Sequence, residues 1–329
     1  MFIIIDLKII NSSGEVKFSE KGEKIDAEFN GAYDEGDKIV IHLKDCEYLA
    51  VKLDETLCES IVFVPNKLME FTVPYGRLKV GYDKDAFSGE SHRISVREPS
   101  EDEIYSERNI ALNSHDLSGI KGVYPHAHAN LVTRNEPCFF ERNAIDGVCE
   151  NKSHGNFPYH SWAAGAREDL EFYLDFGAEA EIEKIVFFLR ADFPHDTYWK
   201  SIDVKLDGGE TFTAEFCETA EGQELVFDER KTTKSIHLTN FKQAVYPFSW
   251  AALSQIEVYG KYIKEDLSKM EIRCASNPKD VKHYTTDRLR EEFHISKLFT
   301  KDNIRMVYSH IDRIITAGLM PIHHELRLE

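Results

Sequence analysis

The sequence predicts a mostly β protein with two antiparallel β-sandwiches followed by a short α+β tail. Short runs of alternating or uniformly apolar residues recur as far as about residue 262, which is the pattern of strands. Clusters of Gly and Asp, such as FNGAYDEGDK, separate these runs and mark turns. After residue 270 the pattern changes to one with helical periodicity, so the third segment differs in class from the first two.

The first predicted domain, 1–100, consists of short strands without a helix. The opening run MFIIIDLKII is interrupted by Asp6 and Lys8 and lacks a basic leader and a small-residue cleavage site. We therefore expect a strand there and not a secretory signal. Five further strands are expected in IDAEF, KIVIHL, YLAVKL, SIVFVP and MEFTV.

A second sandwich is predicted at 107–262, after the charged connection SVREPSEDEIYSERN (95–109). An antiparallel sandwich places its loops at its two ends, where ligands usually bind, and the loops here are rich in His, aromatic and acidic residues. The strands are expected at 168–177, 181–190, 200–209, 224–229, 234–241 and 254–262.

The tail, 270–329, follows the charged linker KYIKEDLSKM (261–270). TTDRLREEFHISKLF begins with a Thr/Asp cap and places Leu289 and Phe293 four residues apart, so one helix is expected at 285–299.

Composition restricts the partners. The formal net charge of −18 repels phosphate backbones, so neither nucleic acid nor an anionic membrane is expected as a partner. No apolar run approaches the length of a membrane span. The six cysteines form no CxxC pair, so we expect reduced thiols in a cytoplasmic protein.

The segments NAIDGVCENKSHGNFPYHSWAAG (143–165) and LEFYLDFGAEAEIEKIVFFLR (170–190) resemble the discoidin domain, also called the coagulation-factor type C or galactose-binding-like domain. The matching motifs are the Asp146-Gly147 turn, Trp162 after a polar loop, the LDFG strand and the late SQIEVYG strand. The resemblance covers about 107–262 and implies a jelly-roll sandwich from a family of carbohydrate-binding modules, adhesion domains and lipid binders.

The same resemblance implies a structural calcium ion. In relatives a turn carboxylate, a polar residue about five positions later and an acid near the last strand hold the ion, and these positions match Asp146, Asn151 and Glu257. Hard oxygen ligands suit Ca²⁺. The alternative is that Asp146 caps its own turn and that Glu257 is a surface residue.

Two loops carry the side chains that a saccharide site needs, namely an apolar face for the sugar ring and planar polar groups for its hydroxyls. They are RADFPHDTYWKS (190–201) and the loop at 154–169, which also carries His154 and Tyr159. The candidate ligand-binding residues are Trp162, Arg167, Asp169, Arg190, Asp192, His195, Trp199 and His160.

The expected ligand is a galactose- or uronate-type sugar, bound through these two loops and a third at 124–135. Arg190 and Arg167 would pair with a uronate carboxylate, whose geometry suits a guanidinium group, and Trp162 or Trp199 would stack on the ring. In the alternative interpretation the two tryptophans close the core, and each arginine forms a plain ion pair with the aspartate two residues later.

The histidines leave several roles open. His126-x-His128 is typical of two imidazoles on one side of a strand, as a transition-metal site requires, but the sequence shows no third ligand beside it. Acid–base catalysis and structural roles remain as alternatives. GxGxxG, GxxxxGK[ST], GxSxG and HExxH are absent from the sequence, so no catalytic residue is assigned.

The tail MEIRCASNPKDVKHYTTDRLREEFHISKLFTKDNIRMVYSHIDRIITAGLMPI (270–322) resembles the N-terminus of 5-keto-4-deoxyuronate isomerase (4-deoxy-L-threo-5-hexosulose-uronate ketol-isomerase), through DRLREEF and MVYSHIDRIITAGLMP. The resemblance implies the start of a double-cupin fold and a link to pectin breakdown. The family's zinc ligands lie in a second cupin half without a counterpart here, so zinc is expected only if that half is present.

The sequence therefore supports a saccharide-binding protein linked to uronate catabolism. The alternatives are an isomerase fusion whose catalytic half is absent from this chain, and a structural or adhesion sandwich. The tail is expected to pack on the preceding domains, to pair with another chain in a homo-oligomer, or to stay poorly ordered. Whether the chain is an enzyme stays open.

Overall fold

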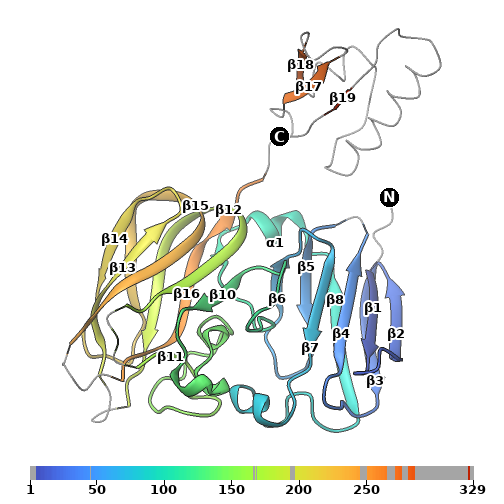
Figure 1. The fold of residues 1–329 in the computed structure, drawn as a ribbon, viewed down its shortest axis with the longest axis horizontal. Coiled ribbons are helices and arrows are strands. Elements are labelled where there is room, and N and C mark those ends of the chain that lie inside the picture. Colours follow the sequence, from blue (N-terminus) through green and yellow to red (C-terminus); the bar gives the residue numbers. More distant parts are fainter. Residues whose placement is uncertain are drawn as a thin grey trace. The chain divides into compact units, whose positions relative to one another are not determined.

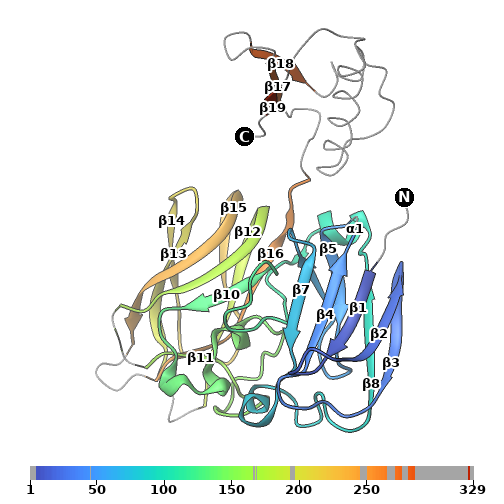
Figure 2. The same cartoon turned by 45° about the vertical axis from the view of Figure 1, so that its right-hand side comes forward.

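The computed structural model describes residues 5–44, 46–165, 167, 169–192, 197–244, 250–264, 271–275, 281–285 and 325–326. The chain divides into two compact units, 1–263 and 264–329. The larger unit contains two β-sandwiches side by side, coloured blue to cyan and green to orange in Figure 1, and Figure 2 shows the same arrangement from a second direction. The described strand pairings are antiparallel, which confirms the predicted mostly β fold class.

The first sandwich consists of two four-stranded sheets with the orders β2-β1-β4-β7 and β3-β8-β5-β6. Its strands are β1 (Ile5–Ile10), β2 (Val16–Gly22), β3 (Lys24–Asn30), β4 (Lys38–Leu43), β5 (Tyr48–Lys52), β6 (Ser60–Phe63), β7 (Leu68–Thr72) and β8 (Ser91–Arg97). The 3-10 helix η1 (Gly76–Gly81) connects β7 to β8.

β1 shows how the alternating pattern produces this sandwich. Ile5, Leu7 and Ile9 are fully buried, while Asp6 and Lys8 between them stay partly exposed. The strands of the six predicted segments are all found. Neither β2 nor β8 was predicted from the sequence. β2 is an edge strand that is largely exposed on both faces, so it lacks the apolar alternation that marks a half-buried strand. The last residues of β8, 95–97, belong to the charged stretch that was expected as a connection.

The second sandwich has one eight-stranded sheet system that folds over on itself. The order is β11-β16-β12-β15-β13-β14, with β10 beside β12 and β9 beside β16. The strands are β9 (Arg108–Asn109), β10 (His126–Ala129), β11 (Trp162–Ala163), β12 (Phe172–Leu189), β13 (Trp199–Leu206), β14 (Thr211–Glu215), β15 (Gln223–Gln243) and β16 (Ala252–Tyr262). The short 3-10 helices are η2 (Thr133–Asn135), η3 (Pro137–Phe139) and η4 (Glu141–Ala144).

Two long strands replace two predicted pairs of short ones. β12 spans both 168–177 and 181–190, and β15 spans both 224–229 and 234–241. The register of β12 against β15 shifts between Asp175 and Ala180, where Gly177 has a φ of +71°. A Cβ atom at 177 would lie 2.5 Å from the Tyr124 ring, so glycine allows both the bend and the close contact. A bulge therefore bends the strand where the sequence pattern indicated its end.

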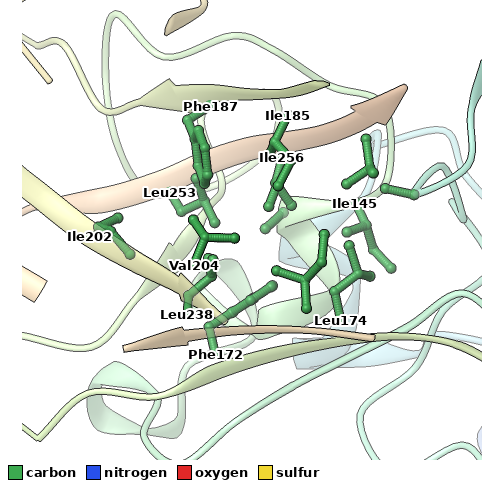
Figure 3. Packing of buried hydrophobic residues seen from close by; sticks show 14 of the residues in the cluster. Ile145, Phe172, Leu174, Ile185, Phe187, Ile202, Val204, Leu238, Leu253 and Ile256 are labelled. Atoms are coloured by element: carbon green, nitrogen blue, oxygen red, sulfur yellow. The ribbon is translucent and has the colours of Figure 1, made fainter. Parts of the chain in front are cut away.

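The core of the second sandwich is filled by inward-facing aliphatic and aromatic side chains from both layers. Figure 3 shows Phe172, Leu174 and Leu238 on one side of this core and Ile185, Phe187 and Ile256 on the other. All six are completely buried.

The segment 95–109, expected as a plain connection, contains the short helix α1 (Glu101–Tyr105), which begins with a capping box between Ser100 and Glu103.

The smaller unit is described only in its strands. β17 (Glu271–Ala275) pairs with β18 (Val281–Thr285) and with β19 (Glu325–Leu326). The helix predicted at 285–299 lies outside the described residues, apart from Thr285 at the end of β18. In the part of the chain that the structure describes, no helix is long and apolar enough to cross a membrane. No disulfide joins the five cysteines described between residues 46 and 217.

A buried arginine joins the two sandwiches. Arg142, in η4, is 3% exposed, and its guanidinium group lies 4.2 Å from the centre of the Tyr82 ring, which belongs to the first core. Its Nη1 donates to the carbonyl of Gly81 at 3.2 Å, and its Nε donates to the carbonyl of Asp116 at 2.9 Å. Its Nη2 donates to the carbonyl of Ser114 and lies 3.6 Å from the Asp146 carboxylate.

We expect Arg142→Ala to reduce the free energy of unfolding by about 3–5 kcal/mol, because it leaves buried acceptors on both sides of the junction without a donor. Urea denaturation monitored by tryptophan fluorescence measures this loss. Arg167→Ala is the control, since that guanidinium group is exposed, and it should change the stability little. Equal, small effects of the two substitutions would contradict the role of Arg142.

Candidate functional site

Three polar side chains meet at the end of β12. Arg190 directly follows this strand and Asp192 comes two residues later. The Arg190 guanidinium group donates to Asp192 through both Nε and Nη2, the latter at 2.6 Å. The Nδ1 atom of His154 lies 2.6 Å from Asp192 Oδ2 and 3.0 Å from Arg190 Nη2. The Arg190 and Asp192 side chains are about 10% exposed, whereas the His154 side chain is 50% exposed.

The backbone explains why these residues converge although they are far apart in sequence. The amide of Arg190 donates to the carbonyl of Ala252 in β16, and the amide of Ala191 donates to the carbonyl of Asn151. The Asn151 side chain in turn donates to the carbonyls of Leu189 and Ala220 at 2.8 and 2.9 Å. Asn151 thus fastens the loop that carries His154 to the end of β12.

Asp192 remains a carboxylate in this cluster. Partial burial acts to raise its pKa, but the hydrogen bonds from Arg190 and His154 outweigh that effect, so the pKa of Asp192 lies below its ordinary value. The carboxylate therefore holds the guanidinium and imidazole groups in place at neutral pH.

An exposed tryptophan adjoins the cluster. Trp250, just before β16, is 58% exposed. Its carbonyl accepts a hydrogen bond from Arg190 Nη1 at 3.3 Å, and its amide donates to Thr197 Oγ1 at 2.6 Å. The sequence reasoning missed Trp250. The signal was available in YPFSW (246–250), an aromatic run between two predicted strands at the end of the sandwich.

Trp162 and Trp199 lie in the core. Both are completely buried, and their ring centroids are 5.8 Å apart. Each ring also contacts Phe241, and the Trp162 indole donates to the carbonyl of Leu131 at 3.0 Å. The prediction that one of them stacks on a sugar ring does not fit these positions. The alternative stated for them, closing the core, describes their packing.

His160 is also buried, and it contacts the carboxylate of Asp146. Its Nε2 atom lies 2.6 Å from Asp146 Oδ2, and Asp146 Oδ1 accepts from the amide of Val148. Arg142 Nη2 forms an ion pair with the same carboxylate, at 3.6 Å from Oδ2. Both oxygens of Asp146 are thus engaged by protein groups.

These contacts do not fit the expected calcium ion. Asp146 is surrounded by donors, the Asn151 amide faces two carbonyls, and Glu257 accepts from the Tyr259 hydroxyl at 2.9 Å. Across the described residues no group of three or more His, Cys, Asp and Glu side chains is arranged to hold a metal ion. Ca²⁺ binds oxygen atoms, and the carboxylates of Asp146 and Glu257 already accept hydrogen bonds from protein groups.

The remaining predicted site residues are not joined to the cluster by any described contact. Arg167 forms an exposed ion pair with Asp169, as in the alternative interpretation, and the Asp169 carbonyl accepts from the Asn130 side chain. His195 lies outside the described residues. Of the predicted ligand-binding residues that the structure describes, Arg190 and Asp192 are the two that lie in the cluster at the end of β12.

The His126-x-His128 pair has two separate environments. His126 Nδ1 lies 2.7 Å from the buried carboxylate of Asp116. His128 stacks on Tyr173, with ring centroids 4.4 Å apart. The two imidazoles therefore contact different groups, one a carboxylate and the other an aromatic ring.

Comparison with known proteins finds a relationship in one short stretch. No family model matches the chain. A 4-deoxy-L-threo-5-hexosulose-uronate ketol-isomerase of Lachnoclostridium phytofermentans is 64% identical over 59 residues, which are 18% of this chain and 21% of that protein. The enzyme of the same name from Oceanobacillus iheyensis is 55% identical over 60 residues, 18% and 22% of the two chains. The chain spans about a fifth of the length of the curated relatives it matches, and the similarity confirms the predicted resemblance of a short segment to this isomerase.

Three of the solved structures that are similar to this chain are carbohydrate-binding modules. Chitosan-binding module 1 of a Paenibacillus chitosanase/glucanase is 18% identical and covers 47% of this chain and 99% of its own, with a TM-score of 0.33. The family 32 module of Clostridium perfringens NanJ, in complex with galactose, is 15% identical and covers 40% and 91%, with a TM-score of 0.31. A fucose-binding module of Streptococcus pneumoniae has a TM-score of 0.32 at 15% identity, and covers 46% and 97%.

The structure predicts opposite consequences for two tryptophans. Trp162→Ala should lower the free energy of unfolding by about 3–5 kcal/mol, because it leaves a cavity in the core. Trp250→Ala should leave the stability nearly unchanged, because its ring is exposed. Thermal unfolding of both variants checks this, and a large loss of stability in Trp250→Ala would place that ring in the core.

Proposed function

We propose that the chain binds a saccharide at the end of the second sandwich, through Trp250, Arg190 and His154. The observation that carries this proposal is the exposed Trp250 ring beside a polar cluster whose members are held by one carboxylate. An exposed aromatic face next to fixed donors and acceptors is the combination that a pyranose ring with its hydroxyls requires.

Each side chain has a separate part in this site. Trp250 supplies the apolar plane for one face of the sugar ring. His154 is half exposed and has its Nδ1 engaged by the cluster, so Nε2 remains for a sugar hydroxyl. Asp192 positions Arg190 and His154, and Arg190 in turn holds the backbone of Trp250 through its carbonyl. This order reduces the entropy that binding would otherwise cost.

The charge balance favours a neutral sugar such as galactose over a uronate. Arg190 directs two of its nitrogen atoms to Asp192 and the third to the carbonyl of Trp250, so its positive charge is already paired. A uronate carboxylate would have to compete with Asp192 for the guanidinium group. The link to uronate and pectin breakdown is supported only by the isomerase-like segment, and it stays a prediction, as does the cytoplasmic location.

Calorimetric titration of the full chain with galactose, galacturonate and pectin-derived oligosaccharides tests the proposal. We expect binding that Trp250→Ala and Arg190→Ala each weaken at least about tenfold, which corresponds to ~1.4 kcal/mol. Arg167→Ala, which also removes an exposed arginine, should bind as the parent chain does. The proposed site would be contradicted if the chain bound none of these sugars. It would also be contradicted if Arg190→Ala and Arg167→Ala changed the affinity equally.

The second candidate function is uronate isomerisation, favoured by the 64% identity of a 59-residue stretch to an isomerase. Interconversion of a ketose and its isomer needs a Lewis acid or acid–base pair at the carbonyl, and the resemblance places the zinc ligands beyond the matched segment. We therefore expect no conversion of 5-keto-4-deoxyuronate by this chain, with or without added zinc. Measurable zinc-dependent turnover would establish it as an enzyme instead.

A further inference from the structure

Large apolar side chains are exposed at six positions in the described part of the larger unit. Val16 and Val226 lie on strands. The other four lie in connections: Trp250 at the proposed sugar site, Tyr159 in the loop that also carries His154, and Tyr75 and Leu78 at η1 of the first sandwich. Their exposed fractions range from 36% for Tyr159 to 58% for Trp250.

The loop that carries His154 runs from the proposed sugar site to η1. At one end His154 contacts Asp192. Three residues later the amide of Phe157 donates to the carbonyl of Val80, within η1, at 2.9 Å. Three residues of chain span at most about 11 Å. η1 therefore lies within reach of the same extended ligand, and Tyr159 follows the contact to η1 by two residues.

A hollow adjoins this part of the surface. It has a volume of about 170 Å³ and lies at the junction of the two sandwiches. Leu78, Pro74, Pro137 and Phe140 line it, together with the polar residues Thr72 and Ser118.

We propose that η1 and Tyr159 form an outer subsite for the sugar residues that continue from the ring bound at Trp250. This inference rests on the proposed saccharide function and specifies its substrate class as an oligosaccharide. The walls suit it chemically, because apolar side chains contact the carbon faces of sugar rings while scattered hydroxyls satisfy their polar edges. It also gives the first sandwich a direct part in binding, since Tyr75 and Leu78 both belong to it.

The test compares galactose with β-1,4-galactotetraose, and galacturonate with tetragalacturonate, by calorimetry on the full chain. Four equivalent rings alone raise the apparent affinity roughly fourfold, so a larger gain requires an additional contact. We expect the tetrasaccharide of the bound type to bind more than about tenfold more tightly than its monosaccharide. In the double variant Tyr75→Ser/Leu78→Ser this gain should fall to the roughly fourfold level, while monosaccharide affinity stays unchanged.

Val226→Ser is the matched control, because it removes an apolar side chain that is even more exposed than Tyr75 and Leu78 but lies on a strand. It should leave both affinities unchanged. Monosaccharide binding without a tetrasaccharide gain, or a gain that the double variant retains, would overturn the outer subsite and leave the proposed function intact. If the parent chain bound none of the sugars, both the proposed function and the outer subsite would be overturned. Thermal unfolding confirms that the double variant is folded.

Discussion

The arrangement of the larger unit depends on the buried guanidinium group of Arg142. In the first sandwich this group contacts the Tyr82 ring and the carbonyl of Gly81. In the second sandwich it contacts the carbonyl of Asp116 and the carboxylate of Asp146. A charged group at this depth is stable only when its donors are all directed at acceptors with good geometry. The two sandwiches are therefore joined by a specific polar contact as well as by apolar packing.

This contact also determines where the candidate site lies. η4, which carries Arg142, is followed by the chain that reaches Asn151, His154 and the contact of Phe157 with Val80. That chain is tied at one point to the end of β12 and at another to η1. The junction between the sandwiches thus holds the loop on which both the proposed sugar site and the proposed outer subsite depend.

Burial separates the three tryptophans into two roles. Trp162 and Trp199 pack against Phe241 and stabilise the interior, whereas Trp250 leaves its ring exposed beside Arg190. Residue type alone does not distinguish these roles, because a tryptophan supplies the same flat apolar surface to a core and to a ligand. Exposure decides between them, and exposure follows from the side of the strand or loop on which each residue falls.

Much of the fold follows from the sequence by itself. Short alternating runs such as IDLKII and KIVIHL predict the strands of the first sandwich, because one face of each must be buried. The ion pairs Arg190–Asp192 and Arg167–Asp169 are also visible in the sequence as residues two apart in a loop.

Only the tertiary structure determines which of these local features form one site. His154, Arg190 and Trp250 are separated by up to 96 positions in the printed sequence, and the pairing of β12 with β16 brings the last two together. Local patterns specify whether a strand forms but not which strand lies beside it, since pairing depends on the burial of the whole core. For the same reason the sequence predicted two short strands where β12 bends at Gly177, and it assigned to the ligand two tryptophans that the core required.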